Sequence, residues 1–367
     1  MLRKIILFIV SVWIVCPFSF AETVYLKSGK KVEGKIIEKA GNYITIDFYG
    51  VTLKYDNDQI SYISNDTAAA AVAAKHEPSQ SASARQPYQV ISRIPAQAGK
   101  SFLWKAASSH ATVYLLGSIH VAKKELYPLR KTIEDAFKVS EVLVVEANIN
   151  DANTLLEAQM RTMATSVYGE GDALERHVSS KTYGLTKKKL AESGLDINQF
   201  AMCKPWFVAM TITGLELKKL GFDPLLGIDA YFLGQAVDKK IIELESADFQ
   251  IKLLSGFSEK EQELFLFSTI IDTNNLRQGL DTLFKSWVSG DAPMVEKLTF
   301  KGLAEYPELS SLLEKLLYQR NITMASKIEG FLKTGGTYFV VVGAGHLIGA
   351  KGILKLLERK GYTAQQL

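Results

Sequence analysis

Hydrophobic and polar residues alternate with a period of two near the start of the chain, which is the pattern of half-buried β-strands. Five short stretches follow it, at residues 24–26, 31–38, 43–48, 51–55 and 60–63. Glycine, asparagine and aspartate separate these stretches and favour tight turns. We therefore expect a small all-β module, an SH3-like barrel, over residues 22–65. It holds no cluster of titratable side chains, which indicates a binding or spacer role.

The segments on either side of this module have a different pattern. At residues 66–97 an alanine run gives way to Ser, Gln, Pro and Arg, with too little apolar content to form a core, so we interpret it as a disordered linker. Residues 1–21 have the charges, the short apolar run and the small residues of a signal peptide. We expect cleavage after Ala21, export to the periplasm and no membrane span in the mature chain. An uncleaved anchor is the alternative.

From residue 98 to residue 367 the pattern is that of an α/β domain. Continuous apolar runs at 112–116, 141–145 and 338–342 are typical of buried strands, and residues 128–137 and 350–360 have helical spacing. The middle, 153–318, is mostly helical and is interrupted by a strand-like run at 241–245. We predict a central mixed sheet flanked by helices, with a large helical insertion and with the first and last strands side by side.

Charge and cysteine content exclude several classes of protein. Removing Arg3 and Lys4 lowers the formal charge from +4 to +2, and the remaining charges are interspersed, so we expect no nucleic-acid partner. The mature chain keeps only Cys203, which rules out an internal disulfide framework. Its apolar surroundings favour a buried structural thiol over a nucleophile. The sequence contains no nucleophile elbow, Walker loop or dinucleotide fingerprint.

Candidate chemistry lies where predicted strands end. Two copies of the pattern Gly-x-x-His follow such strands and place His120 and His346 beyond them, and Glu146 and Glu245 end two others. Ligands gather beyond the carboxyl ends of strands in open α/β sheets. A mixed set of His and carboxylate groups suits a divalent metal such as Mn, Co or Zn, which activates water while a spare carboxylate takes the proton.

Each of these residues also has a purely structural interpretation. A single His after a strand is more often a hydrogen-bonded loop residue, and Glu146 or Glu245 could cap the helix that follows it. Asp229 reads first as a helix cap. Arg320 either makes a surface ion pair or holds a carboxylate bidentately. We interpret Ser118 as a loop or supporting group and not as a nucleophile.

Six short segments, in this order, resemble the TraB/GumN/Tiki family. They are residues 114–121 with 127–129, 143–146, 227–229, 244–245 with Gln250, 320–321 and 342–347. The resemblance covers about residues 99–367 and leaves the amino-terminal module and the linker outside. It implies an α/β domain related to the ChaN and erythromycin-esterase-like proteins.

In the Tiki branch of that family the pattern is associated with metal-dependent peptide cleavage. The resemblance therefore implies His120 and His346 as metal ligands and Glu146 and Glu245 as ligand or general base, and we add Arg320 to the catalytic candidates. Bacterial members are associated with pheromone shutdown or polysaccharide gene clusters. We expect an exported metal-dependent hydrolase acting on a peptide or another envelope-derived substrate. The alternatives are a non-catalytic envelope protein that sequesters a peptide or haem-like ligand, and a role in polysaccharide handling.

Overall fold

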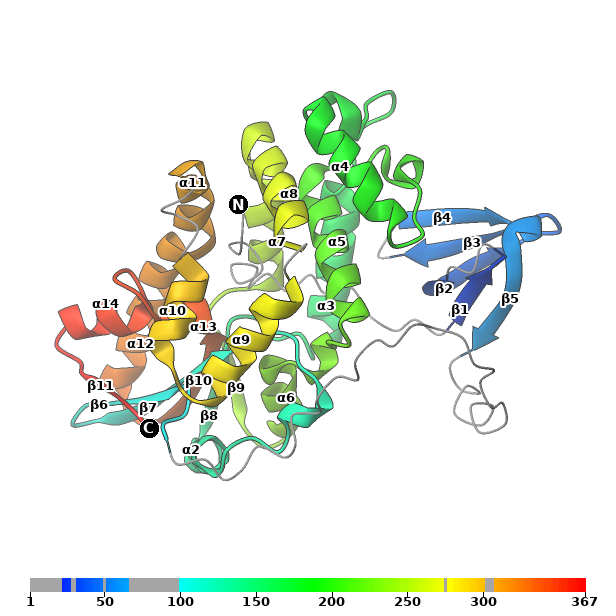
Figure 1. The fold of residues 1–367 in the computed structure, drawn as a ribbon. Coiled ribbons are helices and arrows are strands. Elements are labelled where there is room, and N and C mark those ends of the chain that lie inside the picture. Colours follow the sequence, from blue (N-terminus) through cyan, green and yellow to red (C-terminus); the bar gives the residue numbers. More distant parts are fainter. Residues whose placement is uncertain (1–21, 28–30, 49–50, 66–98, 274–275, 301–306) are drawn as a thin grey trace.

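The computed structural model describes residues 22–27, 31–48, 51–65, 99–273, 276–300 and 307–367 (Figure 1). Within these ranges the chain forms a five-stranded antiparallel sheet, a six-stranded mixed sheet and a set of helices. The predicted signal peptide (1–21) and linker (66–97) lie outside the described residues.

The amino-terminal module contains the five predicted strands. They are β1 (Glu22–Leu26), β2 (Lys31–Lys39), β3 (Tyr43–Phe48), β4 (Val51–Asp56) and β5 (Ile60–Asn65). Their order is β4-β3-β2-β1-β5, with antiparallel pairing throughout. The pairing among the described residues leaves β4 and β5 at the two edges, so the sheet is open and the predicted SH3-like barrel is not confirmed.

The second sheet is the framework of the α/β domain. Its strands are β6 (Leu103–Ala107), β7 (Ala111–Ser118), β8 (Val142–Val145), β9 (Lys240–Glu243), β10 (Gly336–Gly343) and β11 (Ala364–Gln366). The order is β11-β6-β7-β10-β8-β9, and β7, β10, β8 and β9 run parallel. The predicted pairing of the first and last apolar strands is confirmed by β7 and β10. Strands β6 and β11, which were not predicted, add antiparallel strands at one edge.

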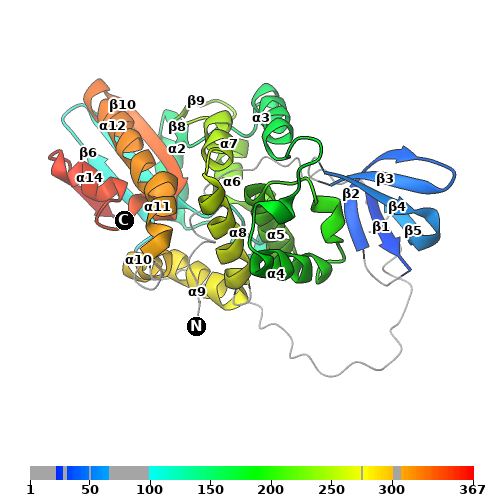
Figure 2. The ribbon, with the colours of Figure 1, turned by 90° about the horizontal axis from the view of Figure 1, so that it is seen from above.

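Helices cover both faces of this sheet. On one side lie α2 (Lys131–Val139) and α6 (Ile228–Gln235), and on the other α12 (Gln319–Thr334) and α14 (Ile353–Arg359). Seen from above, α12 crosses in front of β10 while α2 lies behind the sheet (Figure 2). Burial on both faces explains why β7, β8 and β10 read as continuous apolar runs and not as alternating ones.

The predicted helical insertion is confirmed between β8 and β10, with β9 inside it. Its further helices are α3 (Ala152–Thr165), α4 (Ser180–Ala191), α5 (Pro205–Lys219), α7 (Ala247–Ser255), α8 (Glu259–Thr273), α9 (Leu276–Val288), α10 (Ala292–Phe300) and α11 (Ser310–Leu313), and the short α13 (Ala344–Leu347) follows β10. Short 3₁₀ turns are η1 (Asn57–Gln59), η2 (Lys124–Leu126), η3 (Leu174–Arg176), η4 (Ile197–Phe200), η5 (Pro224–Leu226) and η6 (Pro307–Leu309).

The five-stranded sheet and the helical insertion share a hydrophobic core. Ile46 of the sheet and Phe200 and Trp206 of the insertion are fully buried in the same cluster of apolar side chains. Figure 1 shows the sheet beside α4 and α5. The amino-terminal module therefore packs on the α/β domain and is not an isolated unit.

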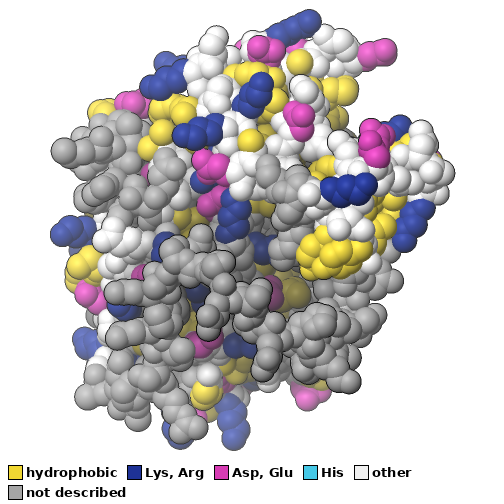
Figure 3. All heavy atoms as spheres, turned by 45° about the vertical axis from the view of Figure 1, so that its right-hand side comes forward, with side chains coloured by type: hydrophobic (Ala, Val, Ile, Leu, Met, Phe, Trp, Pro, Cys, Tyr) yellow, Lys and Arg dark blue, Asp and Glu magenta, His cyan; other side chains and the backbone are white. Residues whose placement is uncertain are grey.

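Three surface and core features bear on the predictions from sequence. Cys203 is buried, as predicted, and burial raises the pKa of its thiol to about 12, which disfavours the thiolate that a nucleophile needs. Basic and acidic side chains are interspersed on the described part of the face in Figure 3. Among the described residues, no helix is both long and apolar enough to cross a membrane.

Candidate functional site

The two Gly-x-x-His segments leave the sheet side by side. In the parallel pairing of β7 with β10, Ser118 lies opposite Gly343, so each histidine follows its strand at the same edge of the sheet. The next two strands end there too, because the amide of Glu245 bonds the carbonyl of Glu146 at 2.8 Å. Four segments far apart in the sequence thus converge at the carboxyl ends of parallel strands, where α/β sheets bind ligands.

The glycine of the first copy is required by close packing. A β-carbon built on Gly117 would lie 2.5 Å from the ring of Phe102, so a larger residue would push β6 from β7. The indole N–H of Trp287 in α9 also donates to the Gly117 carbonyl, at 2.5 Å. These contacts fix the end of β7 and therefore the position from which His120 departs.

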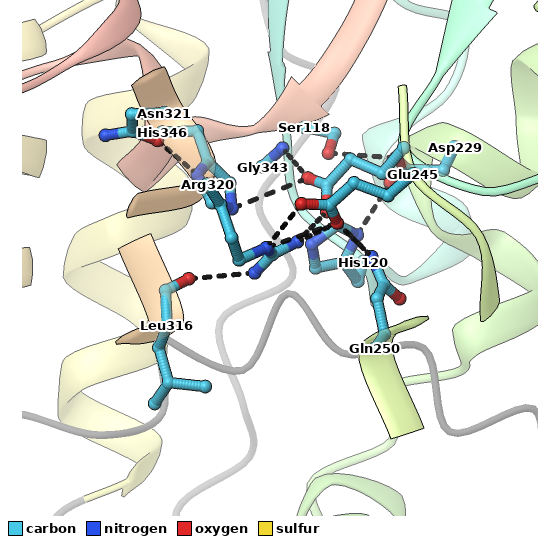
Figure 4. A network of polar contacts seen from close by, with 11 residues as sticks. Ser118, His120, Asp229, Glu245, Gln250, Leu316, Arg320, Asn321, Gly343 and His346 are labelled. Atoms are coloured by element: carbon cyan, nitrogen blue, oxygen red, sulfur yellow. Dashed lines mark hydrogen bonds and ion pairs between the residues drawn. The ribbon is translucent and has the colours of Figure 1, made fainter. Parts of the chain in front are cut away.

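Glu146, Arg320 and Glu245 form a buried ionic network. Figure 4 shows Arg320 and Glu245 within it. Arg320 Nη2 donates to Glu146 Oε2 at 2.7 Å and to Glu245 Oε2 at 2.8 Å, and Nε donates to Glu245 Oε1 at 2.9 Å. The side chain of Gln250 in α7 donates to Oε2 of each carboxylate at 3.1 Å. Arg320 is therefore the bidentate partner of a carboxylate, and the alternative of a surface ion pair is wrong.

Burial sets the electrostatics of this network. Burial raises the pKa of Glu146 above its usual value, against the opposing effect of Arg320. Burial alone would lower the pKa of Arg320, but Glu146 and Glu245 outweigh it and the pKa rises. A guanidinium between two carboxylates thus stays charged, since removing either partner would leave an uncompensated buried charge.

A π-helical turn, η7 (Glu314–Tyr318), precedes Arg320 at the start of α12. The carbonyl of Leu316 accepts a hydrogen bond from Arg320 Nη1 at 2.8 Å, so the side chain is tied to its own helix. π-turns inside helices often occur at functional sites. Here two consecutive residues, Arg320 and Asn321, both reach the site.

His346 is completely buried on α13. Its Nδ1 lies 2.5 Å from Asn321 Oδ1, and Asn321 Nδ2 donates to the carbonyl of Lys351 at 2.9 Å. Burial, followed by the charge of Arg320, lowers the pKa of His346 well below its usual value, so the ring is neutral. Its Nε2 has no hydrogen-bond partner among the described residues and lies 3.9 Å from Glu146 Oε1.

His120 has a different partner. Its Nδ1 lies 2.9 Å from Asp229 Oδ2, and Asp229 Oδ1 accepts a hydrogen bond from Ser118 Oγ at 3.1 Å. Burial disfavours the charged ring, but the carboxylate of Asp229 outweighs burial and the pKa of His120 is raised. The prediction that Ser118 supports the site and does not pair with His120 as a nucleophile agrees with these contacts.

The capping interpretations of the acidic residues are wrong. Asp151 caps α3 and Ser246 caps α7, so neither Glu146 nor Glu245 is a helix cap. Gly227 is the N-cap position of α6, and Asp229 is buried in its first turn, where it holds His120. Asp229 therefore positions His120 and does not cap α6.

Two functional neighbours received no role from the sequence. Gln250 and Asn321 occur in the segments that carried the family resemblance, but no local pattern predicts that their amides bond carboxylates and an imidazole. The only indication in the sequence that Asn321 belongs to the site is that it directly follows Arg320.

The fold and site define an α/β protein with a His, Glu and Arg cluster at the carboxyl ends of parallel strands. The chain belongs to the TraB/PrgY/gumN family, whose family model matches residues 102–366. The predicted family resemblance is thereby confirmed, and the five-stranded sheet lies outside the match.

Several curated proteins resemble the chain. The uncharacterized protein YbaP of Escherichia coli is 26% identical over 277 residues, which are 74% of this chain and 98% of that protein. A protein named metalloprotease TIKI homolog, from Amphimedon queenslandica, is 22% identical over 73% of this chain, and metalloprotease TIKI1 of Xenopus tropicalis is 20% identical over 71%. The matches cover 61% and 60% of those two proteins. No solved structure matches the chain.

The metal implied by these relatives can be tested against the residues present. The Nε2 of His346 and the carboxylate Oε1 of Glu146 are buried and 3.9 Å apart, and imidazole nitrogens and carboxylate oxygens are both ligand types that divalent metals use. His120, with Nδ1 held by Asp229, has the outer partner typical of a metal-bound histidine. The side-chain chemistry of these three residues is that of metal ligands.

Glu245 fits less well, because both its oxygens bond Arg320. Across the described ranges, no group of three or more His, Cys, Asp or Glu side chains is already gathered as a metal site. The metal-ligand assignments of His120, His346, Glu146 and Glu245 therefore stay predictions.

Proposed function

We propose that this chain is an exported, metal-dependent hydrolase that cleaves peptide bonds. The observation that carries the proposal is the buried, neutral His346, whose Nε2 faces Glu146 Oε1 at 3.9 Å with no hydrogen-bond donor of the described chain to satisfy it. Two buried acceptors that face each other are unfavourable unless a cation or a proton donor lies between them.

The charges around the site support a cation. Two carboxylates, of Glu146 and Glu245, bond the one guanidinium of Arg320, and a third, of Asp229, bonds the ring of His120. An excess of buried acidic groups is costly unless a positive charge compensates it. Mn²⁺, Co²⁺ or Zn²⁺ held by His120, His346 and Glu146 would provide that charge and would supply a water of lowered pKa.

The other residues then have defined tasks. Glu146 Oε1 accepts a hydrogen bond from the amide of Gly343 at 2.7 Å and bonds neither Arg320 nor Gln250, and the raised pKa of Glu146 suits a group that accepts a proton in the reaction. Glu245 holds Arg320 in place, and Arg320 holds Glu146. A peptide is the favoured substrate because the Tiki relatives are named metalloproteases.

Metal titration and peptide hydrolysis test this proposal together. The mature protein is stripped with chelator, loaded with Mn²⁺, Co²⁺ or Zn²⁺ and incubated with a peptide library. We expect that adding metal restores peptide cleavage. The kcat/KM for cleavage should fall about 10²-fold or more in His120→Ala and in His346→Ala. The exposed His110→Ala is the matched control. Wild-type metal binding and cleavage in both site variants would refute the proposal.

The alternative of a non-catalytic binder has its own signature. It predicts that a peptide or haem-like ligand is retained unchanged, whereas a hydrolase releases shortened products in a single-turnover experiment analysed by mass spectrometry. Export is tested separately, by sequencing the amino terminus of the protein recovered from the cell envelope, where we expect a start at Glu22.

A further inference from the structure

Two hydrogen bonds connect a backbone carbonyl to the ring of His346. Asn321 Nδ2 lies 2.9 Å from the Lys351 carbonyl oxygen, and Asn321 Oδ1 lies 2.5 Å from His346 Nδ1. A carbonyl oxygen can only accept, so the amide nitrogen of Asn321 must face Lys351. Its oxygen must then face His346, and an amide oxygen also only accepts. The proton of the neutral ring therefore sits on Nδ1.

Glu146 by itself would favour a His346 ring with its proton on Nε2. A proton on His346 Nε2 would point toward the carboxylate oxygen 3.9 Å away, and a neutral ring with the proton on Nδ1 gives up that attraction. Moving the proton from Nδ1 to Nε2 would leave the lone pair of Nδ1 facing a lone pair of Asn321 Oδ1. Rotating the Asn321 amide by half a turn would restore that contact but would set Oδ1 against the carbonyl oxygen of Lys351. Each change leaves a buried polar contact unsatisfied, which costs about 1–3 kcal/mol.

We propose that Asn321 is a positioning residue that fixes His346 with its proton on Nδ1 and so presents the Nε2 lone pair beside Glu146. The part of this inference that concerns a bound cation rests on the proposed function. The part that concerns the position of the proton does not.

The chemistry of the neighbours explains why the two histidines have different partners. Asp229 accepts a hydrogen bond from the hydroxyl of Ser118, so an all-acceptor carboxylate is satisfied there. Asn321 must donate to the carbonyl of Lys351, which a carboxylate cannot do. An amide is the small side chain that accepts from the ring and donates to the backbone at once.

The ring nitrogens of the full chain report the position of the proton directly. Wild-type protein labelled with ¹⁵N-histidine and treated with chelator is measured by long-range ¹H–¹⁵N NMR, and His346→Gln identifies the signal among the five histidines. We expect a protonated Nδ1 and an unprotonated Nε2 at His346. A protonated Nε2 in the wild type overturns the inference, whatever the protein does to peptides.

Substitutions test whether Asn321 is the cause. Asn321→Leu should shift the proton to Nε2 and weaken Co²⁺ binding about 10- to 100-fold. Asn321→Asp keeps an acceptor for Nδ1 but sets an oxygen against the Lys351 carbonyl, which lowers stability, and its carboxylate raises the pKa of His346 as Asp229 does for His120. At a pH high enough for the ring to be neutral, His346 of this variant should keep its proton on Nδ1, as in the wild type. Asn198→Leu, at an exposed position of η4, is the control.

The outcomes separate this inference from the proposed function. Wild-type ring signals and Co²⁺ affinity in Asn321→Leu would overturn the role of Asn321. A neutral ring with its proton on Nε2 in Asn321→Asp would do so too, and that variant decides the matter if Asn321→Leu does not fold. Absence of peptide cleavage with the expected ring signals would overturn the hydrolase and leave the positioning role standing.

Discussion

Asp229 shows how a single residue can set the chemistry of a histidine. Its two oxygens serve different partners, the Ser118 hydroxyl and the His120 ring, and its side chain is almost fully buried. Because the carboxylate lies against the ring, it raises the pKa of His120 even though burial acts in the other direction. His346, paired with an amide, has a lowered pKa instead.

This pairing predicts a pH-dependent stability. The pKa of His120 is higher in the folded chain than in the unfolded one, so the stabilisation is complete below about pH 6.5 and is lost as the pH rises through the folded value. Asp229→Asn removes it. Urea unfolding of metal-free protein should show a larger loss near pH 5.5 than near pH 9, by about 1–2 kcal/mol. The exposed Asp238→Asn should lose little at either pH; an equal loss at both pH values for Asp229→Asn would contradict the prediction.

At the scale of elements, the junction between the end of β7 and the start of α6 holds the first histidine. The amide of Ile228 donates to the Ile119 carbonyl at 3.0 Å, and Gly227 lies against the carbonyl of His120. Asp229 follows Gly227 by two residues, so these contacts place its side chain beside the His120 ring. The helix start and the strand end therefore behave as one unit.

Gly227→Ala should disturb this junction. The added β-carbon would lie 2.3 Å from the His120 carbonyl oxygen, so either the loop or α6 must move. We expect a loss of about 1–3 kcal/mol in urea unfolding, together with weaker metal binding. Gly234→Ala in the same helix is the matched control, since nothing lies within 4 Å of its new β-carbon. It should be neutral or more stable by about 0.5–1 kcal/mol, and equal effects of the two substitutions would argue against the steric explanation.

The whole molecule is tied together by the apolar cluster that the five-stranded sheet shares with the helical insertion. Tyr55 of β4 belongs to the same cluster, and β4 lies against the η4 turn. Although the family match begins only at residue 102, the sheet therefore contributes to the stability of the domain that carries the site.

Ile46→Ala should lower the stability of helices that lie outside its own sheet. Ile46 is fully buried in the shared cluster, so its truncation should cost about 2–5 kcal/mol in unfolding followed by the helical circular dichroism signal. Ile37→Ala, at a half-exposed position of the same sheet, should have little effect. An unchanged helical transition in Ile46→Ala would mean that the sheet and the insertion unfold independently.

Local pattern carried the prediction of most elements. The apolar runs of β7, β8 and β10, the helical insertion and the five short strands of the amino-terminal module were all predicted, because burial on one or both faces leaves a periodic trace in the sequence. The strands β6 and β11 were missed, and barrel closure was predicted without confirmation. The edge strands and the closure of the barrel both depend on which strand edges pair. Pairing between strand edges leaves no periodic pattern of apolar residues in the sequence.

The sequence by itself determined which side chains reach the edge of the sheet. His120, His346, Glu146 and Glu245 follow strands, and strand ends are visible in the pattern of apolar residues. Only the tertiary structure decided what each of them does. The partners Asp229, Asn321, Arg320 and Gln250 come from other helices, and hydrogen bonds between distant segments decide which atoms are charged, protonated or free to bind. Two copies of one motif thus acquire different chemistry from neighbours that no local pattern describes.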